Sequence, residues 1–120
     1  MRSETAAANA TAVNIRNGAS FLKNLKVEQR KLSAPQLYLQ VYNTNAPTVG
    51  TTKPVFVVPV PAMNANVDAA SLSIEAMGPF GGMYFSTALS FACTTTPDGL
   101  TAPTAGDEPR VIIDYNQLGA

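Results

Sequence analysis

Histidine and tryptophan are absent from this chain of 120 residues, and cysteine occurs once, as Cys93. Without histidine, the sequence has no Ser-His-Asp triad, Cys-His pair, histidine metal site or histidine pH switch. A single cysteine excludes an intrachain disulfide and a thiolate cluster that holds a metal. Cys93 ends an apolar run, FSTALSFAC, so we expect a buried structural thiol. The sequence therefore predicts a protein without a cofactor and with few groups for covalent chemistry.

Charged residues are also scarce. They make up 13% of the chain, about half the usual quarter, so much of the surface must be Thr, Ser, Asn, Ala and Pro. The net charge of zero hides an asymmetry: residues 1–53 carry seven basic and two acidic groups, and residues 54–120 carry one basic and six acidic groups. We expect such a chain to dock in a defined orientation to copies of itself or to a charged neighbour. The basic cluster between Arg16 and Lys31 contains one aromatic residue for base stacking, Phe21, and we expect no nucleic-acid partner.

Long apolar runs are missing. No run approaches the roughly 20 apolar residues that cross a bilayer, and residues 1–13 lack the apolar stretch of a secretory signal. We therefore expect neither a membrane partner nor secretion. Residues 1–11 are rich in Ala, Thr, Asn and Ser without an apolar face, which predicts a flexible N-terminal arm that is ordered only against a partner. Residues 12–120 are predicted to form one domain.

Alternation of apolar and polar residues predicts strands in most of this domain. The stretch 12–16 alternates and meets Asn17-Gly18, which predicts a hairpin. Residues 21–32 fit either a helix or a strand, and we favour a strand with Phe21, Lys23, Leu25 and Val27 on one face. The clearer strands are predicted at residues 37–42, 55–60, 71–76, 83–93 and 111–115.

The strand predicted at residues 83–93 has two unlike faces. In residues 83–93 one face is large and apolar, and the other carries Ser and Ala, which predicts that this second face is exposed or closely approached by another backbone. Long loops separate the strands, including residues 43–54 and 94–109. Together these features predict an all-β fold, a single small antiparallel β-sandwich (jelly-roll or immunoglobulin-like) of about six to eight strands.

Residues 55–60 form the candidate interaction site. This strand is apolar on both faces, and Pro59 and Pro61 have no N–H for a ladder, so we expect it at a sheet edge with a second cover. A neighbouring subunit is the natural cover, with the basic cluster as the rim of the contact. The predicted interface residues are Val55, Phe56, Val57, Val58, Arg16, Lys23, Lys26, Arg30 and Lys31.

Candidate groups for other functions are few. The carboxylates Asp107 and Glu108 are adjacent in a loop, no phosphate-binding glycine motif is present, and we expect no enzymatic activity and no metal site. Tyrosines predicted to be exposed allow sugar stacking, which leaves a carbohydrate- or receptor-binding module as an alternative. They are Tyr38, Tyr42 and Tyr84.

Several ordered blocks resemble small structural proteins encoded by tailed bacteriophages and prophages. These are LYLQVYN followed by APTVGTTKPV, then GGMYFSTALSFA, then AGD before the last strand, and the resemblance covers about residues 12–116. It implies a β-sandwich protein of the virion, assembled in the host cytoplasm. The implied role is capsid decoration by a homotrimer that contacts the major capsid protein or another virion protein. A tail, baseplate or fibre-associated role is the alternative. The family carries no catalytic motif to transfer.

Overall fold

The computed structural model consists of strands and loops, and no helix occurs among the residues that it describes. Those residues are 2–29, 35–60, 62, 70–75, 83–97, 99, 101–103 and 107–117. The strands are β1 (Arg2–Ala7), β2 (Val13–Asn17), β3 (Ser20–Gln29), β4 (Leu37–Tyr42), β5 (Phe56–Val60), β6 (Ala70–Glu75), β7 (Met83–Phe85), β8 (Ala88–Thr94) and β9 (Arg110–Gln117).

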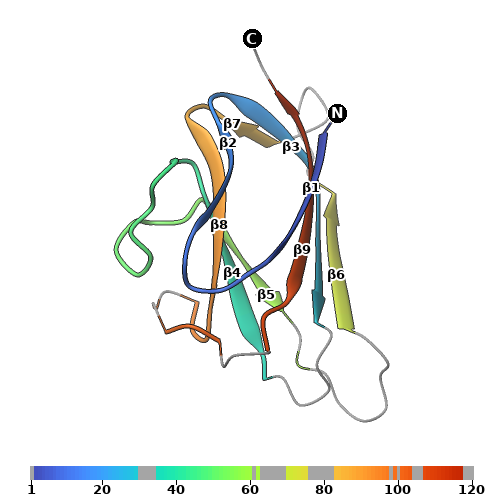
Figure 1. The fold of residues 1–120 in the computed structure, drawn as a ribbon, viewed down its shortest axis with the longest axis vertical. Helices are drawn as coiled ribbons and strands as arrows, with labels where there is room; N and C mark the ends of the chain where they lie inside the picture. Colours follow the sequence, from blue (N-terminus) through green and yellow to red (C-terminus); the bar gives the residue numbers. More distant parts are fainter. Residues whose placement is uncertain are drawn as a thin grey trace.

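The strands form two antiparallel sheets that face each other (Figure 1). The first sheet has the order β1-β9-β3-β6, and the short β7 also pairs with β3. The second sheet has the order β2-β8-β4-β5. The predicted all-β sandwich is therefore confirmed. The described strands are more numerous than predicted, because the N-terminal segment contributes β1 and the stretch 83–93 divides into β7 and β8, which join different sheets.

Alternate side chains of both sheets fill the core between them. In β4 the alternate residues Leu37, Leu39 and Val41 are fully buried, and β8 and β9 place every second side chain in the same core. Burial of these apolar side chains is the main stabilising contribution to such a fold. The principal contributors from these three strands are Leu37, Leu39, Val41, Leu89, Phe91, Cys93, Val111, Ile113 and Tyr115.

The Asn17-Gly18 turn does not close the predicted hairpin. β2 pairs with β8 in the second sheet, whereas β3 pairs with β9, β6 and β7 in the first. Gly18 has a φ of 123°, and its N–H donates to the Thr87 carbonyl at 2.8 Å. The hairpin prediction is wrong because a glycine with positive φ permits a sharp reversal without deciding which sheet the next strand enters.

The strand favoured for the ambiguous segment is confirmed as β3, although its faces differ from the prediction. The register with β9 shifts between Leu22 and Asn24, so Lys23 is an extra residue in a bulge. Leu22 and Leu25 consequently both lie in the core, and Phe21 lies half-buried on the outer face. Residues 30–32 of the same segment lie outside the described residues.

The N-terminal segment differs from the predicted arm. Arg2–Ala7 form the outermost strand of the first sheet and pair in continuous register with β9. The chain then crosses to the second sheet, with the Ala8 N–H donating to the Pro109 carbonyl and the Cys93 N–H donating to the Asn9 carbonyl. Backbone pairing explains the difference, because a strand can be held by its main chain without an apolar face of its own.

The outer face of the second sheet is covered by loops. All seven residues of β8 are buried, including the Ser and Ala residues on the side that faces away from the core. The Ser90 hydroxyl donates to the Thr44 carbonyl at 2.6 Å, which places the loop after β4 directly on this face. Of the two alternatives predicted for the Ser and Ala face of this strand, close approach by another part of the backbone is therefore the one that is found.

Candidate functional site

β5 lies at an edge of the second sheet, as predicted, and its side chains divide between two environments. Val58 and Val60 are buried in the core, and the partly buried Phe56 packs against the core cluster. Val57 and Pro59, together with Val55 just before the strand, are here called the β5 strip; they are half-buried or exposed, and Val55 is 51% exposed. The chain thus leaves part of this apolar edge accessible. Of the four predicted apolar contact residues, Val58 is unavailable for an interface because it belongs to the core.

The geometry of β5 limits how a partner can meet it. Pro59 lies opposite Tyr38 of β4 and has no N–H to offer to an added strand. A proline on an edge strand is one of the devices that prevent edge-to-edge pairing. The β5 strip is therefore suited to side-chain packing against a partner rather than to the extension of its sheet.

The structure does not gather the predicted basic rim beside the β5 strip. Arg16 lies on β2, at the opposite edge of the same sheet. Lys23 and Lys26 lie on β3, in the interior of the other sheet. Arg30 and Lys31 lie outside the described residues. Among the described residues, the apolar and basic parts of the predicted interface are therefore separate surfaces.

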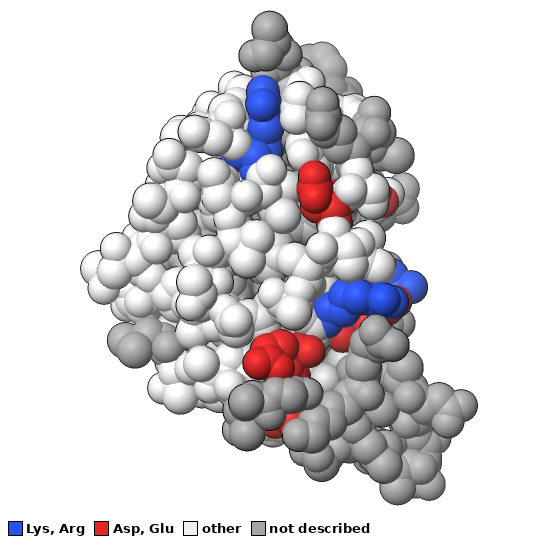
Figure 2. Space-filling view, in the orientation of Figure 1, with Lys and Arg blue, Asp and Glu red and all other residues white. Residues whose placement is uncertain are grey.

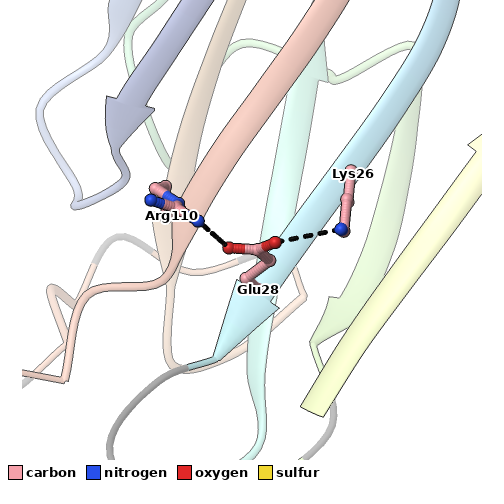
Figure 3. A network of polar contacts seen from close by, with 3 residues as sticks. All are labelled: Lys26, Glu28 and Arg110. Atoms are coloured by element: carbon pink, nitrogen blue, oxygen red, sulfur yellow. Dashed lines mark hydrogen bonds and ion pairs between the residues drawn. The ribbon is translucent and has the colours of Figure 1, made fainter. Parts of the chain in front are cut away.

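Lys26 belongs to an ion-pair network on the outer face of the first sheet (Figure 3). Its Nζ lies 3.0 Å from Glu28 Oε1, and Arg110 of β9 donates from Nε to Glu28 Oε2 at 2.9 Å. Hydrogen bonds from Lys26 and Arg110 lower the pKa of Glu28 below its ordinary value of 4.5. Because Glu28 and Arg110 are directly opposite each other in the β3–β9 register, the network links these two strands by a cross-strand ion pair. This network could not be predicted from the sequence, because β3 and β9 are far apart along the chain.

The same pairing interleaves the basic and acidic halves of the sequence. β3, which carries Lys23 and Lys26, lies beside β9, which carries Asp114. Figure 2 shows basic and acidic groups alternating over one face, with large uncharged areas between them. On this face the charge asymmetry along the sequence therefore does not become a separation of charge. Solvent-exposed ion pairs of this kind contribute little to the stability of the fold.

The structure corrects the predicted exposure of Tyr42. Its side chain is fully buried on the outer side of β4, and its hydroxyl donates to Gln40 Oε1. Burial raises the pKa of Tyr42. Gln40 in turn donates from Nε2 to Thr94 Oγ1 at 2.8 Å and to the Gly99 carbonyl at 3.2 Å. This buried network fastens the loop after β8 to the sheet, and the prediction is wrong because alternation on β4 could not show that a loop covers this face.

Tyr84 is exposed, as predicted, whereas Tyr38 is half-buried. Tyr84 is 55% exposed, and its ring centroid lies 5.4 Å from that of Phe21, with the planes tilted by 47°. The two residues are opposite each other in the β3–β7 register, on the outer face of the first sheet. Phe21 is also opposite Asn116 of β9, so two aromatic rings and an amide lie in one row across three strands. Phe21 was not among the residues predicted for this purpose.

The predicted burial of the Cys93 thiol is confirmed. Cys93 is fully buried, and burial raises the pKa of its thiol to about 12.

Among the described residues, no group of three or more His, Cys, Asp or Glu side chains is placed to hold a metal ion. A hollow of about 330 Å³ lies where β1 meets the start of β9 and includes Glu108 and Arg110 in its lining. Within the described part of the chain no helix is long and apolar enough to span a membrane.

Comparison with known proteins adds no relative. No protein-family model matches the chain, and no curated protein matches it significantly. The resemblance of its sequence blocks to phage structural proteins therefore remains a basis for a proposal.

Proposed function

We propose that the chain is a non-enzymatic structural protein of a tailed-bacteriophage virion, assembled in the host cytoplasm, and that it serves as a capsid decoration protein. The observation that carries the proposal is the β5 strip, an apolar surface left accessible at the edge of the sandwich. Contiguous accessible apolar surface is typical of a contact with another protein. The sequence blocks that resemble phage structural proteins supply the context of that contact.

In this role the sandwich is a rigid support and the β5 strip is the contact. Val55 and its neighbours pack on the major capsid protein or on a second subunit, while Pro59 keeps the edge from pairing with an added strand. Decoration proteins stabilise a shell by many modest contacts, and an oligomer multiplies each of them through effective concentration. We propose a homotrimer, which matches the local three-fold positions of a shell.

The proposal is tested by binding of the purified protein to particles that lack it. Particles are sedimented with increasing amounts of the chain, and the bound ratio at saturation is measured. We expect Val55→Lys to weaken binding at least tenfold, because the substitution places a charge in an apolar contact. Thr51→Lys is the matched control, since Thr51 is exposed on the adjoining loop and lies outside the β5 strip. Equal binding by both variants, with circular dichroism showing both folded, would remove the β5 strip from the contact.

A second candidate, a carbohydrate-binding module, is favoured by the exposed ring of Tyr84 beside Phe21 and Asn116. Aromatic faces next to an amide are a common means of holding a sugar, because the ring covers the C–H face and the amide bonds the hydroxyls. Its test is the thermal shift of the protein with a panel of host-surface glycans. A shift that Tyr84→Ala abolishes supports the module, and the absence of a shift with every glycan opposes it.

A further inference from the structure

The four sheet edges of the sandwich differ in how open they are to another strand. β5 carries Pro59, and β2 has a register shift between Asn14 and Arg16. β6 lies in contact with β5, at the side where the edges of the two sheets meet. β1 differs from β2 and β5, because Arg2–Ala7 pair with β9 without a register shift and the strand contains no proline. β6 is equally regular but lies against β5, and β7, which also pairs with β3, has only three residues. β1 is the regular, unprotected edge among those described.

The hydrogen-bond pattern identifies which backbone groups β1 leaves open. Ala8 N–H donates to the carbonyl of Pro109, which is the next pair after Ala7 and Arg110 in the register. Antiparallel pairs alternate between bonded and non-bonded, so Ala6 and Glu4 also turn their N–H and C=O groups toward β9. Ser3, Thr5 and Ala7 then turn theirs toward the free edge. Within the described part of the chain, β1 has no second neighbouring strand, and these three residues are exposed.

We propose that this edge pairs with the same edge of a second copy of the chain, antiparallel about a two-fold axis at Thr5. Ser3 of one copy then lies opposite Ala7 of the other, and Thr5 lies opposite Thr5. All three open residues of each copy are in bonded pairs in this register, and each such pair exchanges two hydrogen bonds. The first sheet of one copy and the first sheet of the other then form one continuous sheet.

Charge and size of the side chains favour this occupant and this register. β1 carries one basic and one acidic residue, so two copies bring no net charge together. With the axis at Thr5, Glu4 lies opposite Ala6 of the other copy. An axis at Glu4 would instead place two glutamates opposite each other, which is destabilising. The side chains at the open positions are Ser, Thr and Ala, which do not obstruct the approach of another strand. This contact is separate from the β5 strip and does not depend on the proposed function; in a homotrimer it joins two trimers about a two-fold axis.

The test compares self-association of four variants at Thr5 by sedimentation equilibrium. Thr5→Pro removes one free-edge N–H without touching a bond to β9, and we expect it to weaken dimerisation at least tenfold relative to Thr5→Ala. Association through any other surface contributes equally to both variants, so a difference between their association constants reports on the β1 edge. Equal association of Thr5→Pro and Thr5→Ala, with both folded by circular dichroism, overturns the proposal.

Opposite charges at the axis test the register and cover the case in which the proline variant does not fold. Thr5→Lys and Thr5→Glu each place like charges across the two-fold axis, so each alone is expected to associate at least tenfold more weakly than Thr5→Ala. An equimolar mixture of the two is expected to recover the association through a Lys–Glu pair. A mixture that associates no better than either variant alone contradicts pairing centred on Thr5.

Discussion

Phe91→Ala tests the predicted contribution of a central, fully buried side chain to the stability of the core. Phe91 lies in the middle of β8 and is 1% exposed. It is opposite Val13 of β2 on one side and Val41 of β4 on the other, so the ring is held by both neighbouring strands of the second sheet. Its removal leaves a cavity that the surrounding strands cannot close without shifting.

The expected cost follows from the burial of the ring. Truncation of a fully buried phenylalanine lowers the free energy of unfolding by about 3–5 kcal/mol, through lost transfer energy and the residual cavity. Domains of this size are stable by about 5–15 kcal/mol, so the variant retains a folded state with a small margin. At roughly 4 °C per kcal/mol, the melting temperature falls by about 12–20 °C.

The assay is urea unfolding followed by far-ultraviolet circular dichroism, because the chain has no tryptophan to report by fluorescence. Phe21→Ala is the matched control, since Phe21 is half-buried on the outer face and contacts Tyr84. We expect that variant to lose about 1 kcal/mol, the worth of an aromatic pair at a partly exposed site. Equal losses in the two variants would refute the assignment of Phe91 to the core and Phe21 to the outer face.

Three further predictions follow from buried and charged groups. Gln40→Ala should lower the free energy of unfolding by about 1–3 kcal/mol, because the buried hydroxyl of Tyr42 loses its acceptor; an unchanged urea midpoint would show that water replaces the amide. The pKa of Glu28, measured by NMR titration, should lie below 4.5 and rise toward it in Arg110→Ala. Since the folded pKa is lowered, this carboxylate stabilises the fold above pH 4.5, and its contribution is lost as pH falls through the folded pKa; an ordinary pKa in the wild type would contradict the network. Cys93, with a pKa of about 12, should resist a thiol reagent in the folded protein and react on unfolding, and rapid labelling at neutral pH would contradict its burial.

Features that depend on local alternation were predictable from the sequence. The strands β4 and β9 were found from that pattern alone, at residues 37–42 and 111–115. The edge position of β5 was also predictable, because Pro59 restricts a strand whatever its neighbours are. In these cases the cause of the structure lies within a few residues of the feature.

Features that depend on distant contacts were not predictable in this way. Asn17-Gly18 permits a turn, but the entry of β3 into the other sheet is decided by its pairing with β9. The side chain of Tyr42 is buried by loops that come from other parts of the chain. A bulge at Lys23 reverses the inward side of a strand without any special residue. The candidate site shows the same division: the apolar edge was found from the sequence, and its separation from Arg16 and Lys26 required the fold.

The measurement that tests the proposed function most directly is the copy number of this chain in purified virions from the strain that encodes it. Quantitative mass spectrometry, referenced to the major capsid protein, gives that number without any assumption about the contact surface. We expect hundreds of copies per particle, because a protein that decorates the shell is present at many equivalent positions. A handful to a few dozen copies would place the chain in the tail or at a vertex and contradict the decoration role. Complete absence from the particles would contradict a virion function altogether.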